Sequence, residues 1–486
     1  MDMNDIYYKA MLSKDYRFDG KFFVGVKTTM IYCRPICPAR PQRKNIIFFQ
    51  DATSAEKAGY RPCLRCHPEF SPLSPAWSGK SAVIQRALRI IAQYGIVDDE
   101  DTFAEQFGVS ARHLRRLFKD EIGLTPKQIS DNNRLNFAHK LIVETNICIS
   151  TAALTVGFTS LRRFNDAFKK RYHHAPSNMR KKSYLRASSL KSITLKLPYR
   201  PPLDWLSLID YFQRHPIPHV EQANEDCYER IFKTEKSTGF FRVEPDQNQA
   251  WLNLSIYSDD SKSLFDVVNR VRKMFDLDSD PLLIANQFES SQLLSALWKK
   301  WPGLRLARGW DAFETAICTL LGQGVSIEYA SKLAGQLVLH YGEEVYHPLT
   351  QEKWFIFPSA KILMNASLNE IKTTQSRKTA IRELSRKIFN KKIILSEAQD
   401  SELLKNALTQ VKGIGRWSAE YICLRALGDT NAFPATDLIL ERAIKLNSDV
   451  DFNQIMPWRG YSAIYLWKNY AQILSRKGGK SHGTLL

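Results

Sequence analysis

The spacing of apolar residues predicts an amphipathic helix over residues 80–95, with the sequence KSAVIQRALRIIAQYG. Apolar side chains that recur every three or four positions gather on one face of a helix, and that face packs against a core. The apolar residues on this face are Val83, Ile84, Ala87, Leu88 and Ile91. A helical module therefore begins near residue 80.

Two similar segments follow this helix, DTFAEQFGVSARHLRRLFKDEIGLTP at 101–126 and STAALTVGFTSLRRFNDAFKKRYHHAP at 150–176. Each predicts a short helix, a turn at Gly108 or Gly157, and a second helix rich in basic residues, which is a helix-turn-helix layout. In both copies a phenylalanine stands eight residues before a proline, as the pairs Phe118 with Pro126 and Phe168 with Pro176. The duplication disfavours the alternative of two ordinary helical hairpins with solvated basic faces.

From residue 192 the pattern changes to short apolar runs that predict β-strands. These runs are SITLKLPY (192–199), CYERIFK (227–233), GFFRVEP (239–245) and WLNLSIY (251–257). Helices are expected around residues 203–213 and 261–275, so this part forms a small α+β domain that ends near residue 280. The pattern of the remainder, 281–486, is helical.

These patterns divide a chain of 486 residues, which is too long for one core, into four expected domains. Their ranges are 1–75, 76–183, 192–280 and 281–486. The polar and basic stretch 177–191, SNMRKKSYLRASSLK, is expected to be a linker. The expected fold class is multidomain and mainly α, with α+β parts.

The charge of the chain indicates its partner. Lys and Arg total 69 against 50 Asp and Glu, a formal net charge of +19 that favours nucleic acid. The chain has no apolar run of 18 residues, so we expect no membrane span. Its start, MDMNDIYYKAMLSKD, lacks the pattern of a signal peptide. We therefore expect a cytoplasmic, nucleoid-associated protein.

Four of the eight cysteines form the pattern C-x3-C followed by C-x2-C, at Cys33, Cys37, Cys63 and Cys66. In a reducing compartment, such paired thiols predict one tetrahedral zinc ion rather than disulfides. Spacing alone leaves open whether this zinc is only a structural clip. Arg34 and Arg40 belong to a basic, proline-rich loop that suits contact with DNA phosphates. The other cysteines, which we expect to pack in cores, are Cys148, Cys227, Cys318 and Cys423.

The stretches FFVGVKTTMIYCRPICPARPQRKNIIFF and AEKAGYRPCLRCHPE, within residues 5–70, resemble the N-terminal zinc domain of Ada methylation-response proteins. The resemblance implies that Cys33 is both a zinc ligand and the nucleophile that takes a methyl group from a DNA phosphotriester. A zinc-bound sulfur stays deprotonated at neutral pH, which makes this double role chemically reasonable. The cysteines that would remain ligands are Cys37, Cys63 and Cys66.

The duplicated segments resemble the paired helix-turn-helix of AraC-type regulators, over about residues 80–180. The resemblance implies two recognition helices in successive major grooves of promoter DNA. Arg112, Arg116 and Arg163 are the candidate DNA-binding residues, for base edges or for phosphates.

Residues 408–428, LTQVKGIGRWSAEYICLRALG, match a helix-hairpin-helix pattern. Gly413 and Gly415 would let the backbone of the turn approach a DNA phosphate, commonly with a bound monovalent cation. Asp437 follows in NAFPATDLIL, where the residue type suits either an N-cap of the next helix or catalysis.

With FETAICTLLGQGVSI at 313–327 and FPATDL from residue 433 onward, this pattern resembles the AlkA-type alkylbase DNA glycosylases, over residues 192 to about 475. The resemblance implies a strand-rich α+β domain followed by an all-helical helix-hairpin-helix glycosylase domain. It also implies that Asp437 is catalytic and stabilises the positive charge on the sugar as an alkylated purine such as 3-methyladenine leaves.

Trp417 stands where glycosylases of this superfamily that also cleave the strand carry a lysine, so we expect a monofunctional enzyme. By resemblance, Trp417, Tyr421 and Trp467 line the pocket for the flipped base, with core packing as the alternative for Trp467. Gly324 stands where the best-known enzymes carry a leucine that fills the gap left by that base, so Gln323 or a neighbour is expected to replace it.

The expected function is therefore repair of and response to DNA alkylation, by a zinc sensor and regulator fused to a glycosylase. The alternative is mainly an alkylation-responsive transcription factor with a subsidiary or inactive glycosylase half. Ada proteins usually continue into a domain with a P-C-H-R-type cysteine, and because no such string occurs here we expect no repair of oxygen-alkylated guanine. The expected partners are damaged and promoter DNA and the transcription machinery, and the expected state is a monomer.

Overall fold

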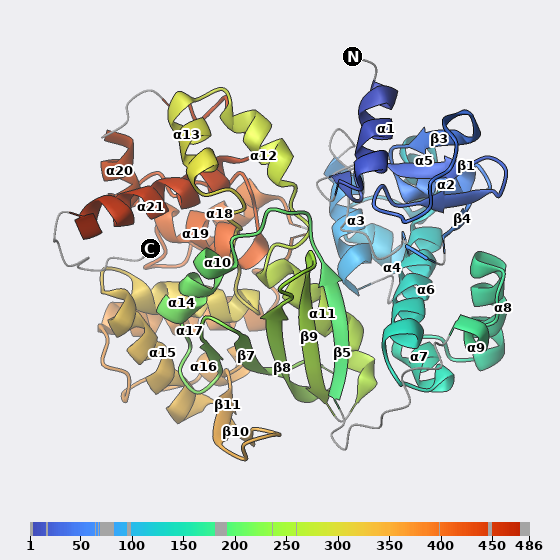
Figure 1. Cartoon of the computed structure of the whole chain (residues 1–486). Coiled ribbons are helices and arrows are strands. Elements are labelled where there is room, and N and C mark those ends of the chain that lie inside the picture. Colours follow the sequence, from blue (N-terminus) through green and yellow to red (C-terminus); the bar gives the residue numbers. More distant parts are fainter. Residues whose placement is uncertain are drawn as a thin grey trace.

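Figure 1 shows the chain as a smaller N-terminal group of sheet and helices beside a larger C-terminal body. The computed structural model describes residues 3–15, 18–63, 65–66, 68, 82–94, 99–179, 192–235, 237–258, 260–397, 399–445 and 450–476. Most of the predicted linker, residues 180–191, lies outside the described residues, and its first residues belong to helix α9 (Pro176–Met179).

The N-terminal part is a small sheet with helices packed against it. Its strands are β1 (Phe23–Val26), β2 (Ile31–Cys33), β3 (Ile46–Phe49) and β4 (Arg61–Pro62), in the spatial order β3-β1-β2-β4. Its helices are α1 (Met3–Ser13), the 3-10 helix η2 (Arg43–Asn45) and α2 (Ala52–Lys57). Strand β2 ends at Cys33 and its parallel neighbour β4 ends just before Cys63, so both halves of the cysteine pattern meet at one edge.

The repeat folds as two helix-turn-helix units, as predicted, and a long helix that was not predicted lies between them in the chain. The helices are α3 (Ala82–Tyr94), α4 (Glu100–Glu105), α5 (Ala111–Glu121), α6 (Pro126–Glu144), α7 (Ile149–Thr155) and α8 (Leu161–Tyr172). Gly108 and Gly157 adopt positive φ angles of 69° and 84°, which a residue with a side chain would rarely adopt. Phe118 and Phe168 are fully buried, which explains their matching positions in the repeat.

The predicted strand-rich domain forms one antiparallel sheet, and all four predicted strands are present. Its strands are β5 (Ser192–Pro198), β6 (Glu221–Ala223), β7 (Tyr228–Lys233), β8 (Thr238–Pro245) and β9 (Trp251–Ser258), in the order β5-β9-β8-β7-β6. Helix α10 (Trp205–Arg214) and the pair η5 (Ser261–Ser263) and α11 (Leu264–Met274) match the two predicted helices. The three-residue edge strand β6 was not predicted, since so short a run has no readable alternation.

The C-terminal part is helical with one exception. Its helices are α12 (Pro281–Phe288), α13 (Gln292–Lys300), α14 (Ala312–Gly322), α15 (Ile327–Tyr341), α16 (Ala360–Leu363), α17 (Gln375–Phe389), α18 (Ser401–Thr409), α19 (Arg416–Leu427), α20 (Leu438–Lys445) and α21 (Arg459–Arg476).

The prediction that this part is all helical was wrong at one place, because β10 (Glu343–Tyr346) and β11 (Lys353–Ile356) form an antiparallel hairpin. Three consecutive residues of β11, Trp354 to Ile356, are buried, and Phe355 N donates to the carbonyl of His219 at 2.8 Å. Packing against the neighbouring domain therefore holds this segment extended.

Buried hydrogen bonds join the N-terminal part to the C-terminal part. The fully buried Arg200 guanidinium donates from Nε to the carbonyl of Asp19 at 2.8 Å and from Nη1 to the carbonyl of Asp278 at 2.9 Å. Lys21 Nζ lies 2.9 Å from Asp280 Oδ1. Buried carbonyls require donors, so these bonds define how the small sheet sits on the larger body.

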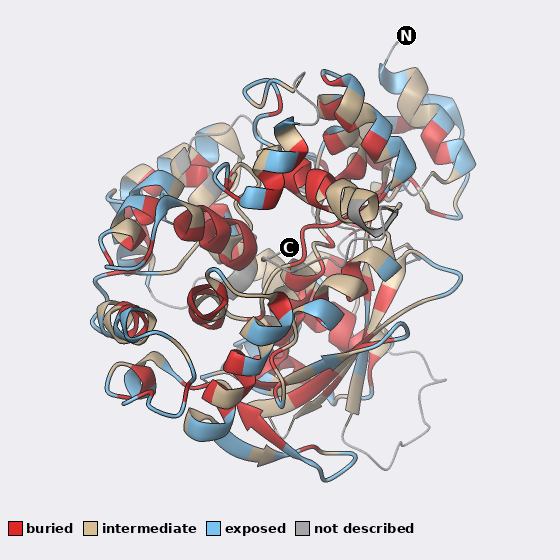
Figure 2. Ribbon diagram, turned by 90° about the vertical axis from the view of Figure 1, so that its left-hand side faces the viewer, coloured by how far each residue is buried: buried red, intermediate tan, exposed pale blue. Residues whose placement is uncertain are grey.

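The second helix-turn-helix unit contacts both of its neighbours. The Arg171 guanidinium donates to both carboxylate oxygens of Glu56, at 2.7 and 2.9 Å. The backbone of Lys196 in β5 donates to Glu144 Oε2 at 2.9 Å and accepts a bond from Lys140 Nζ at 2.5 Å. One hydrophobic cluster also runs from α6 and α8 into the five-stranded sheet, and Figure 2 shows the buried segments of the ribbon in red.

The prediction that all four isolated cysteines lie in cores was wrong for Cys148. Cys227 and Cys423 are buried, but Cys148 is exposed and caps α7, where its Sγ accepts from Thr151 N at 3.4 Å. Hydrogen bonds from the Ser150 and Thr151 hydroxyls lower the pKa of this thiol to about 7. The apolar neighbours Ile147 and Ile149 pack against the hydrophobic cluster of α6, α8 and the five-stranded sheet, and this context misled the prediction for Cys148.

The helices that the structure describes include none with the length and apolar character to cross a lipid bilayer.

Candidate metal centre and candidate active site

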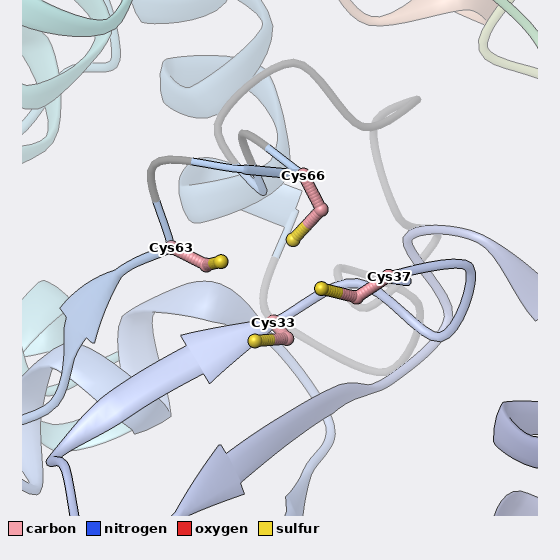
Figure 3. Close-up of side chains that lie close together, drawn as sticks. All are labelled: Cys33, Cys37, Cys63 and Cys66. Carbon is pink, nitrogen blue, oxygen red and sulfur yellow. The ribbon is translucent and has the colours of Figure 1, made fainter. Parts of the chain in front are cut away.

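The four clustered cysteines converge on one point, as Figure 3 shows. Their Sγ atoms all lie within 4.8 Å of one another. Cys33 ends β2, Cys37 follows a turn closed by its own N–H to the carbonyl of Arg34, and Cys63 and Cys66 follow β4. Four sulfurs at this separation fit the tetrahedral shell that zinc prefers.

The chemistry of this donor set also fits a divalent cation. The hydrogen bond with the Cys37 thiol, followed by other sulfur contacts and burial, raises the pKa of the Cys33 thiol. Four thiols this close cannot all ionise unless a cation balances their charge, which zinc would do. The four cysteines therefore form a zinc-binding site.

Backbone N–H groups distinguish the four sulfurs. Arg34 N donates to Cys66 Sγ at 3.3 Å and Arg65 N donates to Cys63 Sγ at 3.5 Å. The Cys33 thiol and, to a smaller extent, a backbone bond at Ala39 lower the pKa of Cys37. In the described part of the chain, the contacts of Cys33 are with the other thiols and include no such backbone bond. An N–H bond stabilises a thiolate and weakens it as a nucleophile, so Cys33 is the least restrained of the four.

The two arginines expected to contact phosphates occupy different settings. Arg40 is exposed. Arg34 is only 11% exposed, and its guanidinium donates to the carboxylate of Asp19, with Nε 2.8 Å from Oδ1, and to the carbonyl of Cys66 at 3.3 Å. Because the Asp19 carbonyl also accepts from Arg200, Arg34 links the cysteine cluster to the C-terminal body.

The basic residues of the two recognition helices lie where DNA could reach them. Arg112 and Arg116 of α5 and Arg163 of α8 are exposed. Ser110 and Ser160 cap the two helices by accepting the N–H of the third residue, which fixes where each helix begins. Arg171, at the end of α8, instead binds Glu56 and is not free for DNA.

The helix-hairpin-helix consists of α18, the turn at residues 410–415, and α19. Gly413 has φ of 99°, and a Cβ there would lie 3.1 Å from the Ala380 Cβ. Gly415 has ordinary backbone angles and open space at its Cβ position, directly before the first turn of α19. The first amides of a helix have no partner within the helix, so this open N-terminus suits a phosphate.

Gln323 is bound to the hairpin. Its Nε2 donates to the carbonyl of Gly413 at 2.9 Å and to Ser418 Oγ at 2.8 Å. Gly324, beside it, is exposed and has φ of 62°, and a Cβ on this residue would meet nothing within 4 Å. A side chain here would have space, but the positive φ would disfavour it.

Asp437 is 7% exposed and accepts four hydrogen bonds. Its Oδ1 accepts from the backbone N of Ile439 at 3.1 Å and of Leu440 at 2.9 Å, which caps α20. Its Oδ1 also accepts from Trp467 Nε1 at 3.0 Å, and its Oδ2 accepts from Trp417 Nε1 at 3.1 Å. The two interpretations of Asp437 are thus compatible, because one carboxylate both caps a helix and faces the aromatic cluster.

The loop that carries Asp437 is fastened to the hairpin helices by a buried lysine. Lys405 Nζ lies 2.8 Å from Glu420 Oε2, and the same oxygen accepts from Phe433 N at 3.1 Å. Burial lowers the pKa of Lys405, but the hydrogen bonds with Glu420 and Glu402 outweigh burial and raise it. A charged lysine therefore holds this loop in place.

The predicted aromatic residues meet around this carboxylate. The rings of Trp417 and Tyr421 stack, with centroids 5.3 Å apart and planes 19° apart, and Trp467 lies 6.3 Å from Tyr421. Trp467 is 4% exposed, so it is packed in the core and also bonded to Asp437. Trp417 is half-buried and is the more accessible face of the cluster.

Two residues of this cluster were not predicted. Arg425 lies over the Tyr421 and Trp467 rings, and Tyr211 of α10 lies beneath its guanidinium at 4.3 Å. Spacing could have indicated Arg425, since it follows Tyr421 by four residues on the same helix. No local signal indicates Tyr211, which comes from another domain.

Two helix-turn-helix units with exposed arginines, a zinc-binding cysteine cluster and a buried carboxylate among aromatic rings thus share one chain, which defines a class of multidomain helix-turn-helix proteins with a candidate active site. Family models agree: the metal binding domain of Ada matches residues 6–69, a helix-turn-helix domain matches 103–182, and the AlkA N-terminal domain matches 194–311.

Named relatives match nearly the whole chain or separate parts of it. The probable bifunctional transcriptional activator/DNA repair enzyme AlkA of Mycobacterium tuberculosis (strain ATCC 25618 / H37Rv) is 33% identical over 475 residues, 95% of each chain. DNA-3-methyladenine glycosylase 2 of Escherichia coli (strain K12) is 24% identical over 56% of this chain and 95% of its own length. The E. coli (strain K12) bifunctional transcriptional activator/DNA repair enzyme Ada is 35% identical over 32% of this chain and 43% of its own.

The chain therefore belongs to the family of bifunctional transcriptional activator/DNA repair enzymes AlkA.

Proposed function

We propose that this protein excises alkylated purines such as 3-methyladenine from duplex DNA, senses alkylation by accepting a methyl group on Cys33, and regulates transcription in response. The observation that carries the enzyme half is the Asp437 carboxylate, held by the indole N–H groups of Trp417 and Trp467 beside a helix-hairpin-helix. The names of the M. tuberculosis and E. coli relatives support the same activity.

In the glycosylase half, Asp437 stabilises the positive charge that develops on the sugar as the bond to the base breaks. The electron pair of that bond leaves with the base, and a water molecule adds its oxygen to the sugar carbon and loses a proton. Gly413 and Gly415 bring the backbone of the hairpin to a DNA phosphate, with a monovalent cation as the expected aid.

The same half makes no nick. Trp417 occupies the position where a strand-cleaving relative needs a lysine amine, and an indole cannot form a Schiff base. Its nitrogen is moreover engaged with Asp437. The product is an abasic site, which a separate enzyme must process.

In the sensor half, the Cys33 sulfur attacks the methyl carbon of a DNA phosphotriester. A carbon–sulfur bond forms as the carbon–oxygen bond breaks, and the phosphate keeps the electron pair. Zinc, when bound, would keep the four sulfurs deprotonated. Cys37, Cys63 and Cys66 stay ligands because backbone N–H bonds restrain their sulfurs.

Methylation removes one negative charge from the cluster and lessens its repulsion from the DNA backbone. Binding at a promoter through Arg112, Arg116, Arg163 and the exposed Arg40 of the loop then strengthens. The protein, acting as a cytoplasmic, nucleoid-associated monomer, engages the transcription machinery. Because the methyl group stays on Cys33, each protein molecule can accept one methyl group only.

Two assays on the full-length, zinc-loaded protein test the proposal. Incubation with methylated duplex should release methylated purine, detected by chromatography, and strand cleavage should require added alkali. Mass spectrometry after incubation with methylphosphotriester DNA should place one methyl group on Cys33. Failure to release any base would overturn the enzyme half, and an unmodified Cys33 with zinc bound would overturn the sensor half.

A further inference from the structure

A buried cation stands at one end of the aromatic cluster. Arg425 follows Trp417 and Tyr421 at intervals of four residues along α19, so the three side chains share one helix face. The Arg425 side chain is 3% exposed. Its guanidinium carbon lies 4.3 Å from the centre of the Tyr211 ring, 5.7 Å from Trp467 and 5.9 Å from Tyr421.

The charge of this guanidinium is balanced mainly by ring faces. Among the described residues its partners are these rings and the Ala307 carbonyl, 2.9 Å from Nη1, and none is a carboxylate. Its buried Nε has no hydrogen-bond partner in the part of the chain that the structure describes. Arginine stays protonated in proteins, so a full positive charge sits against the electron-rich faces of the cluster.

Tyr421 lies in a column between Trp417 and Arg425. The Trp417 indole stacks on its ring from the preceding turn of α19, and Arg425 approaches from the following turn. Both faces of Tyr421 are therefore in use, and the half-buried Trp417 is the ring with a face to offer a base. Since Trp417 Nε1 donates to Asp437, the column runs from a positive pole at Arg425 to a negative pole at Asp437.

We propose that Arg425 is a specificity-determining residue of the glycosylase site, whose fixed charge offsets part of the preference of the electron-rich rings for cationic bases such as 3-methyladenine and thereby favours neutral damaged bases. This inference rests on the proposed glycosylase function, with the flipped base held against the aromatic cluster. Arg425 touches no reacting atom; it acts through the rings and through its electrostatic field.

The direction of the effect follows from how charge moves when the bond to the sugar breaks. A neutral base leaves with the electron pair of that bond and becomes negative until water protonates it, and a nearby positive pole stabilises that charge. A cationic base becomes neutral as it leaves, but before the bond breaks it is repelled by the same pole. Arg425 therefore aids the departure of neutral bases and weakens the binding of cationic ones.

The test compares two duplexes under single-turnover conditions, one with hypoxanthine as the neutral base and one with 7-methylguanine as the cationic base. For each, the maximal rate and the half-saturating protein concentration are measured, and their quotients are compared between the two lesions. Arg425→Met should raise the cationic-to-neutral ratio about fivefold or more. Only the Tyr421 and Trp417 rings separate the buried charge of Arg425 from a base stacked on Trp417, and unit charges still interact appreciably across such a water-excluded path.

Three variants separate charge from shape. Arg425→Gln, which keeps a donor for the Ala307 carbonyl, should shift the ratio as Arg425→Met does. Arg425→Lys, which keeps the charge, should retain the wild-type ratio. Lys468→Met should also retain it, because Lys468 lines the same recess and bonds Ser207 but is not stacked on the rings of the column and is less buried than Arg425.

A cationic-to-neutral ratio that stays within twofold of wild type in Arg425→Met and Arg425→Gln would overturn this inference and leave the proposed function intact. An equal loss of activity on both lesions in all three Arg425 variants would do the same. A wild-type protein that releases neither base would overturn the proposed function and this inference with it.

Discussion

Replacing Asp437 with asparagine separates the two structural roles of this side chain. Asparagine keeps an oxygen that can accept the N–H groups of Ile439 and Leu440, so the cap of α20 is retained. It loses the negative charge, and its NH2 group then faces the N–H of Trp417, where two donors meet. We therefore expect the chemical step to suffer far more than the fold.

The magnitude follows from electrostatics. A carboxylate about 4 Å from a developing positive charge contributes about 4 kcal/mol at the effective dielectric of a protein site. That energy corresponds to a loss of about 1,000-fold in the rate of base release. The fold should lose only about 1 kcal/mol in Asp437→Asn, since one indole bond is lost while the cap persists.

Two companion variants define the comparison. Asp437→Ala removes the cap as well as both indole bonds, so it should be at least as slow and clearly less stable than Asp437→Asn. Asp400→Asn changes the cap of α18, where the carboxylate accepts Leu403 N at 3.0 Å away from any indole, and should release base at the wild-type rate.

The assay measures single-turnover release of 3-methyladenine from methylated duplex, with protein in excess, alongside thermal unfolding of each variant. Asp437→Asn should show a collapsed rate and a melting temperature near that of wild type. A rate within threefold of wild type together with a lowered melting temperature would show that Asp437 is only a helix cap.

Three further predictions address the hairpin, the contact between the parts, and the exposed thiol. Gly413→Ala should lower both the melting temperature and the DNA affinity, since an alanine held at the positive φ of this position costs about 1–3 kcal/mol. Gly415→Ala should lower the DNA affinity alone. An equal fall in melting temperature in both variants would contradict this. Arg200→Met leaves the buried carbonyls of Asp19 and Asp278 without donors and should destabilise the full chain by about 2–3 kcal/mol in denaturant titrations. Arg214→Met at the surface should not destabilise it. Equal unfolding midpoints for the two variants would contradict the contact between the N-terminal and C-terminal parts. Among the four cysteines outside the cluster, Cys148 should react first with iodoacetamide. Its reaction rate should be half-maximal near pH 7 and fall below it, because the thiol is then protonated. Mass spectrometry that finds Cys148 unmodified at pH 8 would refute its exposure and its lowered pKa.

Much of the architecture was predictable because its signals are local. The glycine turns at Gly108 and Gly157, the alternating runs of the five-stranded sheet and the spacing of the four cysteines each lie within a few dozen residues. Such patterns reflect backbone sterics and side-chain periodicity, which operate over short distances along the chain. The three-residue strand β6 and the hairpin of β10 and β11 gave weaker patterns. Pairing with β7 made β6 a strand, and contact with the strand-rich domain at His219 helps to hold β11 extended.

The candidate sites divide in the same way. Residue types at motif spacing identified Asp437 and the cysteine cluster as candidates, but two interpretations of Asp437 and of Trp467 stayed open. The structure shows that Asp437 caps α20, that Trp467 is packed in the core, and that the two are bonded to each other, and these roles are compatible with the functional interpretations, which stay predictions. For Cys148, the isolated position in the sequence indicated a core residue, and the turn before α7 placed it outside.

What the sequence by itself determined is the set of modules, their order, and the chemistry each is equipped to perform, because these depend on residue types at short spacing. Only the tertiary structure decided which residues meet across modules. Asp19 accepts from Arg200, 181 residues away, and thereby ties Arg34 and the cysteine cluster to the C-terminal body. Tyr211 of the strand-rich domain and Arg425 of the hairpin helix meet in the same way at the end of the aromatic column. Such contacts leave no local pattern, because they arise from the burial of whole surfaces when separately folded modules pack together.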